Sequence, residues 1–234
     1  MKKNNFIESI DIKEIDMEKC YFNPGCAFAI YNNNSVNEIL EILNKNFGDV
    51  KLHNICCHNN PGLENGSTII NNCAGCDRRF RSLYDGVNTI SLWEILDSIK
   101  ELKLPSYDDM FVSVQDSCSF REKPQVHKAI RSLLNKMNIK VVESENSGTN
   151  SICCGDSFYG SIPLEDVHKF QKRRALQMPC DDVVVYCVSC IKSMAIGEKS
   201  PKYMIDLILN KKTEVGDIDL VSYHDELEEY IKEH

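Results

Sequence analysis

Short apolar runs alternate with longer amphipathic stretches along most of this 234-residue chain. The runs have the length and composition of buried β-strands, and the stretches carry apolar residues at helical spacing. The strand-like runs are 20–22, 50–55, 68–70, 111–114, 139–142 and 183–186. The helical stretches lie near 36–43, 92–99, 124–137 and 163–178. Alternation of this kind predicts an α/β protein with small parallel sheets covered by helices.

The chain also repeats one order of cysteines. In each half a single cysteine is followed by an adjacent pair and then by a C-x-x-C motif. The first set is Cys26, Cys56, Cys57, Cys73 and Cys76, and the second is Cys118, Cys153, Cys154, Cys187 and Cys190. Each cysteine comes where a predicted strand ends, and a helix is expected to start at each C-x-x-C. Ligands collect beyond the carboxyl ends of parallel strands, and helix N-termini there favour anionic thiolates and sulfides.

These repeats predict two Rossmann-like halves, related by a pseudo-twofold axis, with the boundary near Leu104-Pro105-Ser106. Residues 1–105 would form the N-terminal cysteine-rich half, and residues 106–234 the C-terminal half with an acidic tail. The second half has an additional helix at 163–178, where the first half has only an Asn-, Pro- and Gly-rich loop at 58–66. In the tail, Leu220, Val221, Leu227 and Ile231 form an apolar stripe that packs on its own domain or docks on a partner protein.

Composition limits the cellular compartments and the classes of partner that we expect for this protein. The formal charge is −8, and no Lys/Arg stretch alternates with aromatic residues, which argues against nucleic acid. No apolar run approaches the ~18 residues of a membrane span. The polar segment Met1 to Glu18 does not have the pattern of a secretory signal. We therefore expect a cytoplasmic protein, in which twelve cysteines indicate metal or redox chemistry rather than disulfides. Cys20 and Cys180, outside the repeat, are expected to be structural.

Five thiolates in this order favour a metal centre larger than a single ion. Structural zinc takes four ligands, usually from two C-x-x-C-like knuckles, whereas each half has five cysteines and one knuckle. Adjacent cysteine side chains point apart, so a Cys-Cys pair suits a multi-iron cluster better than one ion. The ferredoxin run C-x2-C-x2-C-x3-C-P, which binds cubane clusters, is absent.

The motifs resemble those of the cysteine-rich "CCG" domain, found in the disulfide-reducing subunit of heterodisulfide reductase and in its relatives. In the second half, Asp116-Ser117-Cys118, Ser151-Ile152-Cys153-Cys154-Gly155 and Tyr186-Cys187-Val188-Ser189-Cys190 are similar to its three elements. In the first half, Asn23-Pro24-Gly25-Cys26 and Asn72-Cys73-Ala74-Gly75-Cys76 match its opening and its C-x-x-C. The resemblance covers roughly residues 20–210.

The resemblance implies two non-cubane [4Fe–4S] clusters, each held by one set of five cysteines. In heterodisulfide reductase the clusters face each other, and the disulfide substrate binds between them. The chain would then be an iron–sulfur oxidoreductase subunit that reduces a disulfide or relays electrons. It has neither a G-x-G-x-x-G motif nor a P-loop, so electrons would come from a ferredoxin-like or flavoprotein partner.

The first half departs from the family pattern. His58 stands where the motif has Gly, and the loop from the pair to the C-x-x-C is about half the usual length. The first site can therefore hold a cluster, zinc or nothing. From another class of function, the alternative is a non-enzymatic module for assembly or redox sensing, stabilised by zinc or by a single cluster.

Several charged residues near the cysteines are further candidates. His58 is a proton donor, an extra ligand or merely an exposed loop residue. Arg121 neutralises cluster charge, grips an anionic substrate or forms a surface ion pair, and Arg78 and Arg79 are weaker candidates for the same roles. Ordinary surface positions are expected for the remaining basic residues in helical stretches: His127, His168, His224, Lys172, Arg173 and Arg174.

Overall fold

The structure, a computed structural model, describes residue 12 and residues 15–234. Most of the segment from Met1 to Glu18, for which the sequence predicts no secretory signal, lies outside these residues. Within the described part of the chain, no helix has both the length and the apolar character needed to cross a membrane.

Two four-stranded parallel sheets form the framework, one in each half of the sequence. Their orders are β2-β1-β3-β4 and β6-β5-β7-β8, so the second sheet repeats the topology of the first. The strands are β1 (Cys20–Asn23), β2 (Lys51–Leu52), β3 (Thr68–Asn71), β4 (Asn88–Ser91), β5 (Phe111–Gln115), β6 (Lys140–Val141), β7 (Asp182–Val185) and β8 (Ser200–Tyr203). The predicted α/β class with two Rossmann-like halves is confirmed.

Helices cover both sheets, and four of them match the stretches of helical spacing predicted near 36–43, 92–99, 124–137 and 163–178. The α-helices are α1 (Cys26–Tyr31), α2 (Asn33–Phe47), α3 (Ala74–Leu83), α4 (Leu92–Ser98), α5 (Pro124–Lys136), α6 (Leu164–Ala175), α7 (Val188–Ile196), α8 (Met204–Ile208) and α9 (Leu220–Glu233). Single 3-10 turns are η2 (Met17–Lys19), η3 (Cys118–Phe120), η4 (Gly148–Asn150) and η5 (Asp156–Phe158). The expected additional helix of the second half is α6.

Both C-x-x-C motifs start helices, as expected. Cys73 is the N-cap of α3 and Cys187 is the N-cap of α7, each with an extended backbone. Cys76 and Cys190 then fall in the first helical turn, where backbone N–H groups have no helical partner. The two strands that lead to these motifs, β3 and β7, are buried along nearly their whole length. Strands buried on both faces read as continuous apolar runs, which is why both are visible in the sequence.

The two halves pack on each other reciprocally. In each half a turn or short helix begins at the single cysteine, η3 in the second half and α1 in the first. Helix α1 contacts α7 of the second half, and η3 contacts α3 of the first. The same pair of elements therefore meets twice with the roles of the halves exchanged, which is the pattern of a twofold interface. The domain boundary near residue 105 lies between β4 and β5 and stays a prediction.

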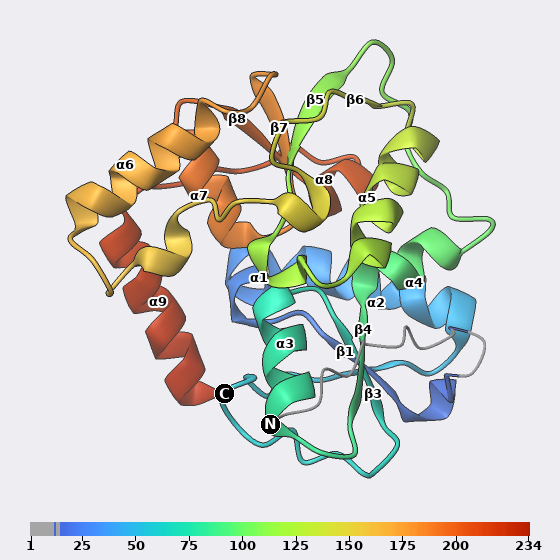
Figure 1. Cartoon of the computed structure of the whole chain (residues 1–234). Helices are drawn as coiled ribbons and strands as arrows, with labels where there is room; N and C mark the ends of the chain where they lie inside the picture. Colours follow the sequence, from blue (N-terminus) through green and yellow to red (C-terminus); the bar gives the residue numbers. More distant parts are fainter. Residues whose placement is uncertain (1–11, 13–14) are drawn as a thin grey trace.

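The C-terminal helix α9 crosses from one half to the other. In Figure 1 it runs along the left side of the molecule, from beside α6 and α7 down to the first sheet, where the chain ends. It contacts α1, and Leu220 and Tyr223 on its inner face are buried. Packing on the chain itself, one of the two outcomes expected for the tail, is therefore observed. The prediction that Val221 belongs to the apolar stripe is wrong: it is 42% exposed, and Tyr223 takes the inner position.

Two surface positions predicted from the sequence are wrong. His127 on α5 is only 5% exposed, and Arg174 on α6 is only 2% exposed. Each side chain is held by buried polar partners from other elements rather than by its own helix. Helical periodicity cannot reveal these partners because they come from distant parts of the chain.

Candidate metal centres

The first cysteine set gathers at the carboxyl ends of β1 and β3. Cys56 and Cys57 lie in the turn after β2 that is closed by the Asn59 N–H bonded to the Cys56 carbonyl at 2.9 Å. Their thiols, together with that of Cys76, pack against Ile69 and Phe80 in a small apolar cluster, with Cys73 at its edge. Four thiols thus meet in one place, although they are up to twenty residues apart in sequence.

Contacts between thiols control the pKa values in the first set. The thiol of Cys56, followed by that of Cys76, lowers the pKa of Cys57 to about 3. Cys57 in turn raises the pKa of Cys56 and of Cys76. Burial raises the pKa of Cys26 to about 12, with a further contribution from nearby Cys73. The five thiols of the first set are therefore close enough to influence one another's ionisation.

The five thiols of the second cysteine set influence one another's ionisation. Cys153 raises the pKa of Cys118, and further influences link Cys153, Cys154, Cys190 and Cys187. The thiols of Cys118 and Cys154 hold the pKa of Cys153 well below its usual range. Its sulfur also accepts the Gly155 N–H at 3.3 Å and lies 2.9 Å from the Ser157 hydroxyl.

At two glycines the backbone lies so close to neighbouring side chains that there is no room for a Cβ atom. Gly25 has a φ of +75°, and a Cβ there would lie 3.0 Å from the Cβ of Cys73 and 3.3 Å from the Sγ of Cys76. Gly155 has a φ of +111°, and a Cβ there would lie 2.6 Å from Cγ of Gln171 on α6. Side chains at such φ values are strained. In both halves the glycine next to a cysteine is therefore required by backbone conformation and by space.

In each half a buried side-chain amide at the end of a strand forms a hydrogen bond to the residue before the cysteine pair. Asn23, three residues before Cys26, donates from Nδ2 to the carbonyl of Ile55 at 3.2 Å. Gln115, three residues before Cys118, donates from Nε2 to the carbonyl of Ile152 at 3.0 Å. Ile55 and Ile152 immediately precede the two cysteine pairs. These amides thus fix the distance between the single cysteine and the pair, and neither was predicted from the sequence.

Replacing either amide with leucine should damage only its own site. Asn23→Leu leaves the Ile55 carbonyl without this donor, and Gln115→Leu does the same for Ile152. A buried polar group that loses its partner costs about 1–3 kcal/mol. We expect Asn23→Leu to speed metal loss to a chelator from the first site, and Gln115→Leu from the second. Each variant is the control for the other, and equal loss from both sites in both variants would contradict this role.

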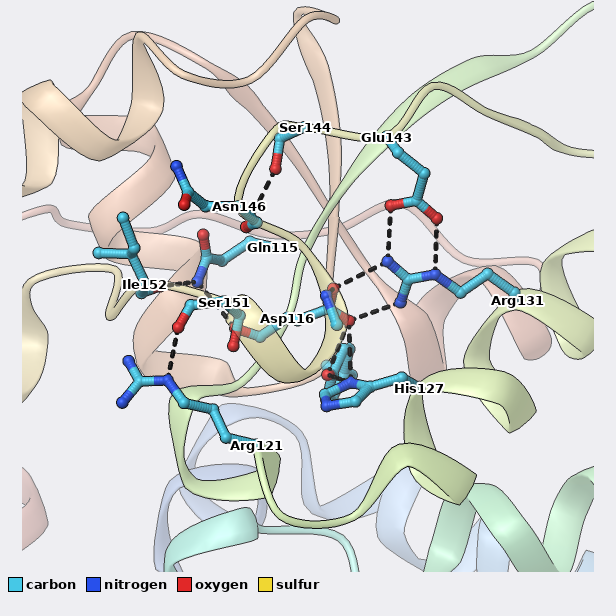
Figure 2. Close-up of polar contacts among 12 residues, drawn as sticks. Gln115, Asp116, Arg121, His127, Arg131, Glu143, Ser144, Asn146, Ser151 and Ile152 are labelled. Atoms are coloured by element: carbon cyan, nitrogen blue, oxygen red, sulfur yellow. Dashed lines mark hydrogen bonds and ion pairs between the residues drawn. The ribbon is translucent and has the colours of Figure 1, made fainter.

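An acidic residue two positions before Cys118 organises a charged network, shown in Figure 2. Asp116 is fully buried, and Arg131 donates to its two oxygens at 2.5 and 2.8 Å. Tyr186 OH and the Gly148 N–H also donate to it, and the His127 ring lies 3.2 Å away. Burial alone would raise the pKa of Asp116, but these donors lower it below its usual range. The network joins the start of η3 to α5 and to the loop before Cys153.

Helix α9 covers both cysteine sites. Its Tyr223 OH lies 3.0 Å from the Ser189 hydroxyl, inside the second C-x-x-C, and Cys187 and Cys26 both help to raise the pKa of Tyr223, after burial. Ile231 packs against the first cysteine cluster. The Cys56 N–H donates to the carbonyl of His234, the last residue, at 3.2 Å. Helix α9 therefore lies against residues of both cysteine sets.

Weakening α9 should expose the first site selectively. Ile231→Asp places a charge against the thiol cluster and should release the end of the helix. We expect Cys56 and Cys57 of metal-free protein to react with iodoacetamide several-fold faster, as mapped by mass spectrometry. Val221→Asp, which adds the same charge on the exposed face of α9, is the matched control. Unchanged reactivity in Ile231→Asp would mean that α9 does not shield the site.

The charged candidates differ in how closely they approach the thiols. His58 is exposed, and its charge contributes to the low pKa of Cys57. Arg79 donates from Nε to the Cys57 carbonyl at 3.2 Å, whereas Arg78 is exposed. Arg121 donates to the carbonyl of Ser151, two residues before Cys153 (Figure 2). His224 is held in place by two contacts, because its ring lies 3.1 Å from Asp156 and stacks on Tyr159. No catalytic role of His58 or Arg121 follows from these contacts alone.

The two remaining cysteines, Cys20 and Cys180, lie outside both cysteine sets. Cys20 is fully buried in the main core, and its thiol donates to the Asp16 carbonyl at 3.4 Å. Burial raises its pKa to about 11. Cys180 is half-buried at the loop before β7. Their places in the fold fit the structural role expected for them.

The donor sets fit a soft metal centre. Thiolates are the ligands of zinc and of iron–sulfur clusters. In the described part of the chain, no three His, Cys, Asp or Glu side chains converge where a single ion could bind. The C-x-x-C cysteines lie at the N-termini of α3 and α7, and the other cysteines of each set lie at the starts of α1 and η3 or in loops and turns. Such thiol-rich sets suit a metal or iron–sulfur centre.

Comparisons with known proteins agree with this chemistry. The chain matches the family described as cysteine-rich domain (CCG) over residues 112–195, a segment that contains all five cysteines of the second set. Searches of curated proteins and of solved structures found no match. Together with the gathered thiols, the match indicates a metal-binding or iron–sulfur role for the chain. Residues 112–195 are thus similar to the cysteine-rich domain (CCG) family.

Proposed function

We propose that this chain is an iron–sulfur oxidoreductase subunit, similar to the disulfide-reducing subunit of heterodisulfide reductase. Each set of five cysteines would hold one non-cubane [4Fe–4S] cluster. The chain would take electrons from a ferredoxin-like or flavoprotein partner and reduce a disulfide or pass the electrons on. The observation that carries this proposal is the gathering of two equivalent thiol sets on halves that pack reciprocally.

The number of thiols in each set favours clusters over a structural zinc ion. A structural zinc ion needs four donors around one point, at Zn–S distances of about 2.3 Å. The described thiols are not arranged around such a point. In the second set the five thiols influence one another's pKa values, which supports one five-cysteine site. In the first set a five-ligand site needs Cys26 close to Cys73 and Cys76, and Gly25 permits this because it has no Cβ.

The protein residues would orient the two centres and exclude water between them. When bound, each cluster would supply one-electron transfer. Reduction of a disulfide takes two electrons and two protons and yields two thiols, so a pair of centres matches its electron demand. Helix α9 covers the region where Cys26 and Cys187 both act on Tyr223. A protonated phenol and buried surroundings at that place favour chemistry shielded from bulk water.

Disulfide reduction can be tested with reduced methyl viologen as the electron donor under anaerobic conditions. We expect the viologen to be oxidised only when a disulfide is present, with two viologen radicals consumed and two thiols formed per disulfide. Glutathione disulfide and an aromatic disulfide are suitable probes. Cys154→Ser/Cys190→Ser protein, which lacks two ligands of the second set, is the control. Viologen oxidation at the same rate in this control would overturn the proposed role of the cysteine sites.

A further inference from the structure

A cavity opens beside Cys153, on the side of the second half formed by α6 and η5. Its volume is about 340 Å³, and Cys153 lies in its wall. The other lining residues are Arg121, Ile152, Phe158, Phe170, Arg173, Arg174 and Gln177. All of them belong to the second half, and Arg121 directly follows η3, which contacts α3 of the first half. The cavity therefore adjoins the second cysteine set at Cys153.

Two arginines of this cavity have uncommitted guanidinium nitrogens. Arg121 uses Nε for the Ser151 carbonyl, and its two terminal nitrogens point away from the Asp116 network in Figure 2. The guanidinium of Arg173 lies over the ring of Phe170, with 4.6 Å between Cζ and the ring centre. Neither has another hydrogen-bond partner among residues 15–234. On a chain with a net charge of −8, this is a local concentration of free positive charge.

The other basic groups nearby already have hydrogen-bond or ion-pair partners. Arg174 is buried and donates to Gln115, Gln177 and the Asn146 carbonyl. Lys169 pairs with Glu165 at 2.9 Å and with Asp166 at 3.0 Å. The free donors at the cavity are therefore those of Arg121 and Arg173. Guanidinium groups bind carboxylate and phosphate through paired N–H donors, which gives both strength and orientation.

The remaining walls are aromatic and apolar. Phe158 and Phe170 lie with their ring centres 4.9 Å apart and their planes at 36°. Ile152 adds an apolar side chain that is 39% exposed. Such a surface gains stability by covering a ring or a short aliphatic group. At the edge, the Cys153 sulfur is fixed by the Gly155 N–H and by Ser157.

We propose that this cavity binds a small molecule that joins a carboxylate or phosphate to an aromatic or apolar group. The anionic group lies on Arg121 and Arg173, and the apolar part lies against Phe158 and Phe170. The ligand then sits beside the Cys153 sulfur. This site does not depend on the proposed function, because its contacts are made by protein side chains alone.

Binding can be measured by isothermal titration calorimetry with phenyl phosphate, benzoate and inorganic phosphate, and with neutral benzyl alcohol as the uncharged probe. We expect saturable binding of the two aromatic anions, and weaker binding of inorganic phosphate and of benzyl alcohol. Comparison of phenyl phosphate with benzoate shows which anion the arginines prefer. If inorganic phosphate binds as tightly as phenyl phosphate, the aromatic walls do not contribute and the proposed ligand class is wrong.

Arg173→Gln and Arg121→Gln should each weaken binding of the aromatic anions about tenfold, which is the loss of roughly one charge-assisted hydrogen bond. Binding of benzyl alcohol should not change. Arg78→Gln, which removes an exposed arginine from α3 in the other half, is the matched control. Arg121 also donates to the Ser151 carbonyl, so Arg121→Gln can disturb folding. In that case the affinity of Arg173→Gln alone tests the proposal. Unchanged affinity in Arg173→Gln, or no saturable binding to the parent protein, would overturn the proposal.

Discussion

Removing two thiols from either cysteine set should cut the iron content of the chain by about half. In anaerobically purified protein we expect Cys57→Ser/Cys76→Ser to lose the iron of the first site, and Cys154→Ser/Cys190→Ser that of the second. Combining the four substitutions should remove nearly all iron. The expectation follows from the separate thiol contacts within each set. Thiolate ligands hold such clusters directly, and serine is a poor substitute for a soft donor.

Cys180→Ser is the matched control for these variants. Cys180 is a half-buried cysteine of the same half as the second set, and its backbone N–H bonds to Ser113. Its substitution should leave iron and acid-labile sulfide unchanged. If either double variant lost the iron of both sites, the two halves would share one centre. If Cys180→Ser lost iron to the same extent, overall folding rather than ligation would explain the losses.

Asp116→Asn is expected to be the most damaging substitution outside the cysteines. The groups that donate to this carboxylate are fixed: two nitrogens of Arg131, the Tyr186 hydroxyl and the Gly148 N–H. An amide would turn its own NH2 group towards these donors and would leave Arg131 paired only with Glu143, whose side chain is 45% exposed. Breaking a buried ion pair by removing one partner costs about 3–5 kcal/mol. We expect the free energy of unfolding to fall by about 3 kcal/mol for this reason.

Urea denaturation of the parent and variant proteins measures this loss. The control is Asp97→Asn, which removes a carboxylate that pairs with Lys136 at 2.6 Å where both side chains are partly exposed. Surface ion pairs contribute about 1 kcal/mol or less. The Asp116 variant should also retain less iron at the second site, because η3 and the loop before Cys153 lose their common anchor. Equal stability losses in the two variants would contradict the organising role of Asp116.

The sequence predicts the parts of the site that depend on local order. Strands that are buried on both faces, such as β7, appear as continuous apolar runs, and a C-x-x-C after such a strand predicts where a helix starts. The repeated cysteine order then implies two equivalent halves. The strands and helix starts can be seen within about twenty neighbouring residues, so no knowledge of long-range contacts is needed for them.

The parts that the sequence does not reveal depend on contacts between distant segments. Asn23 and Gln115 give no signal of their own, although their equal spacing before Cys26 and Cys118 marks them once the repeat is known. Helical spacing places His127 on the surface because nothing near it on α5 indicates Asp116 or Tyr186 as partners. The position of α9 over both sites depends on the loop between α8 and α9, whose path has no periodic pattern.

The most direct test of two cysteine-ligated clusters is metal and sulfide analysis of anaerobically purified parent protein, combined with EPR of the oxidised state. We predict about eight iron and about eight acid-labile sulfide per chain, as two four-iron clusters require. We also predict an EPR signal that changes when thiol is added. About four of each would leave one cluster, and the first site would then be the vacant one. Zinc in place of iron, with no sulfide, would contradict the account for both halves.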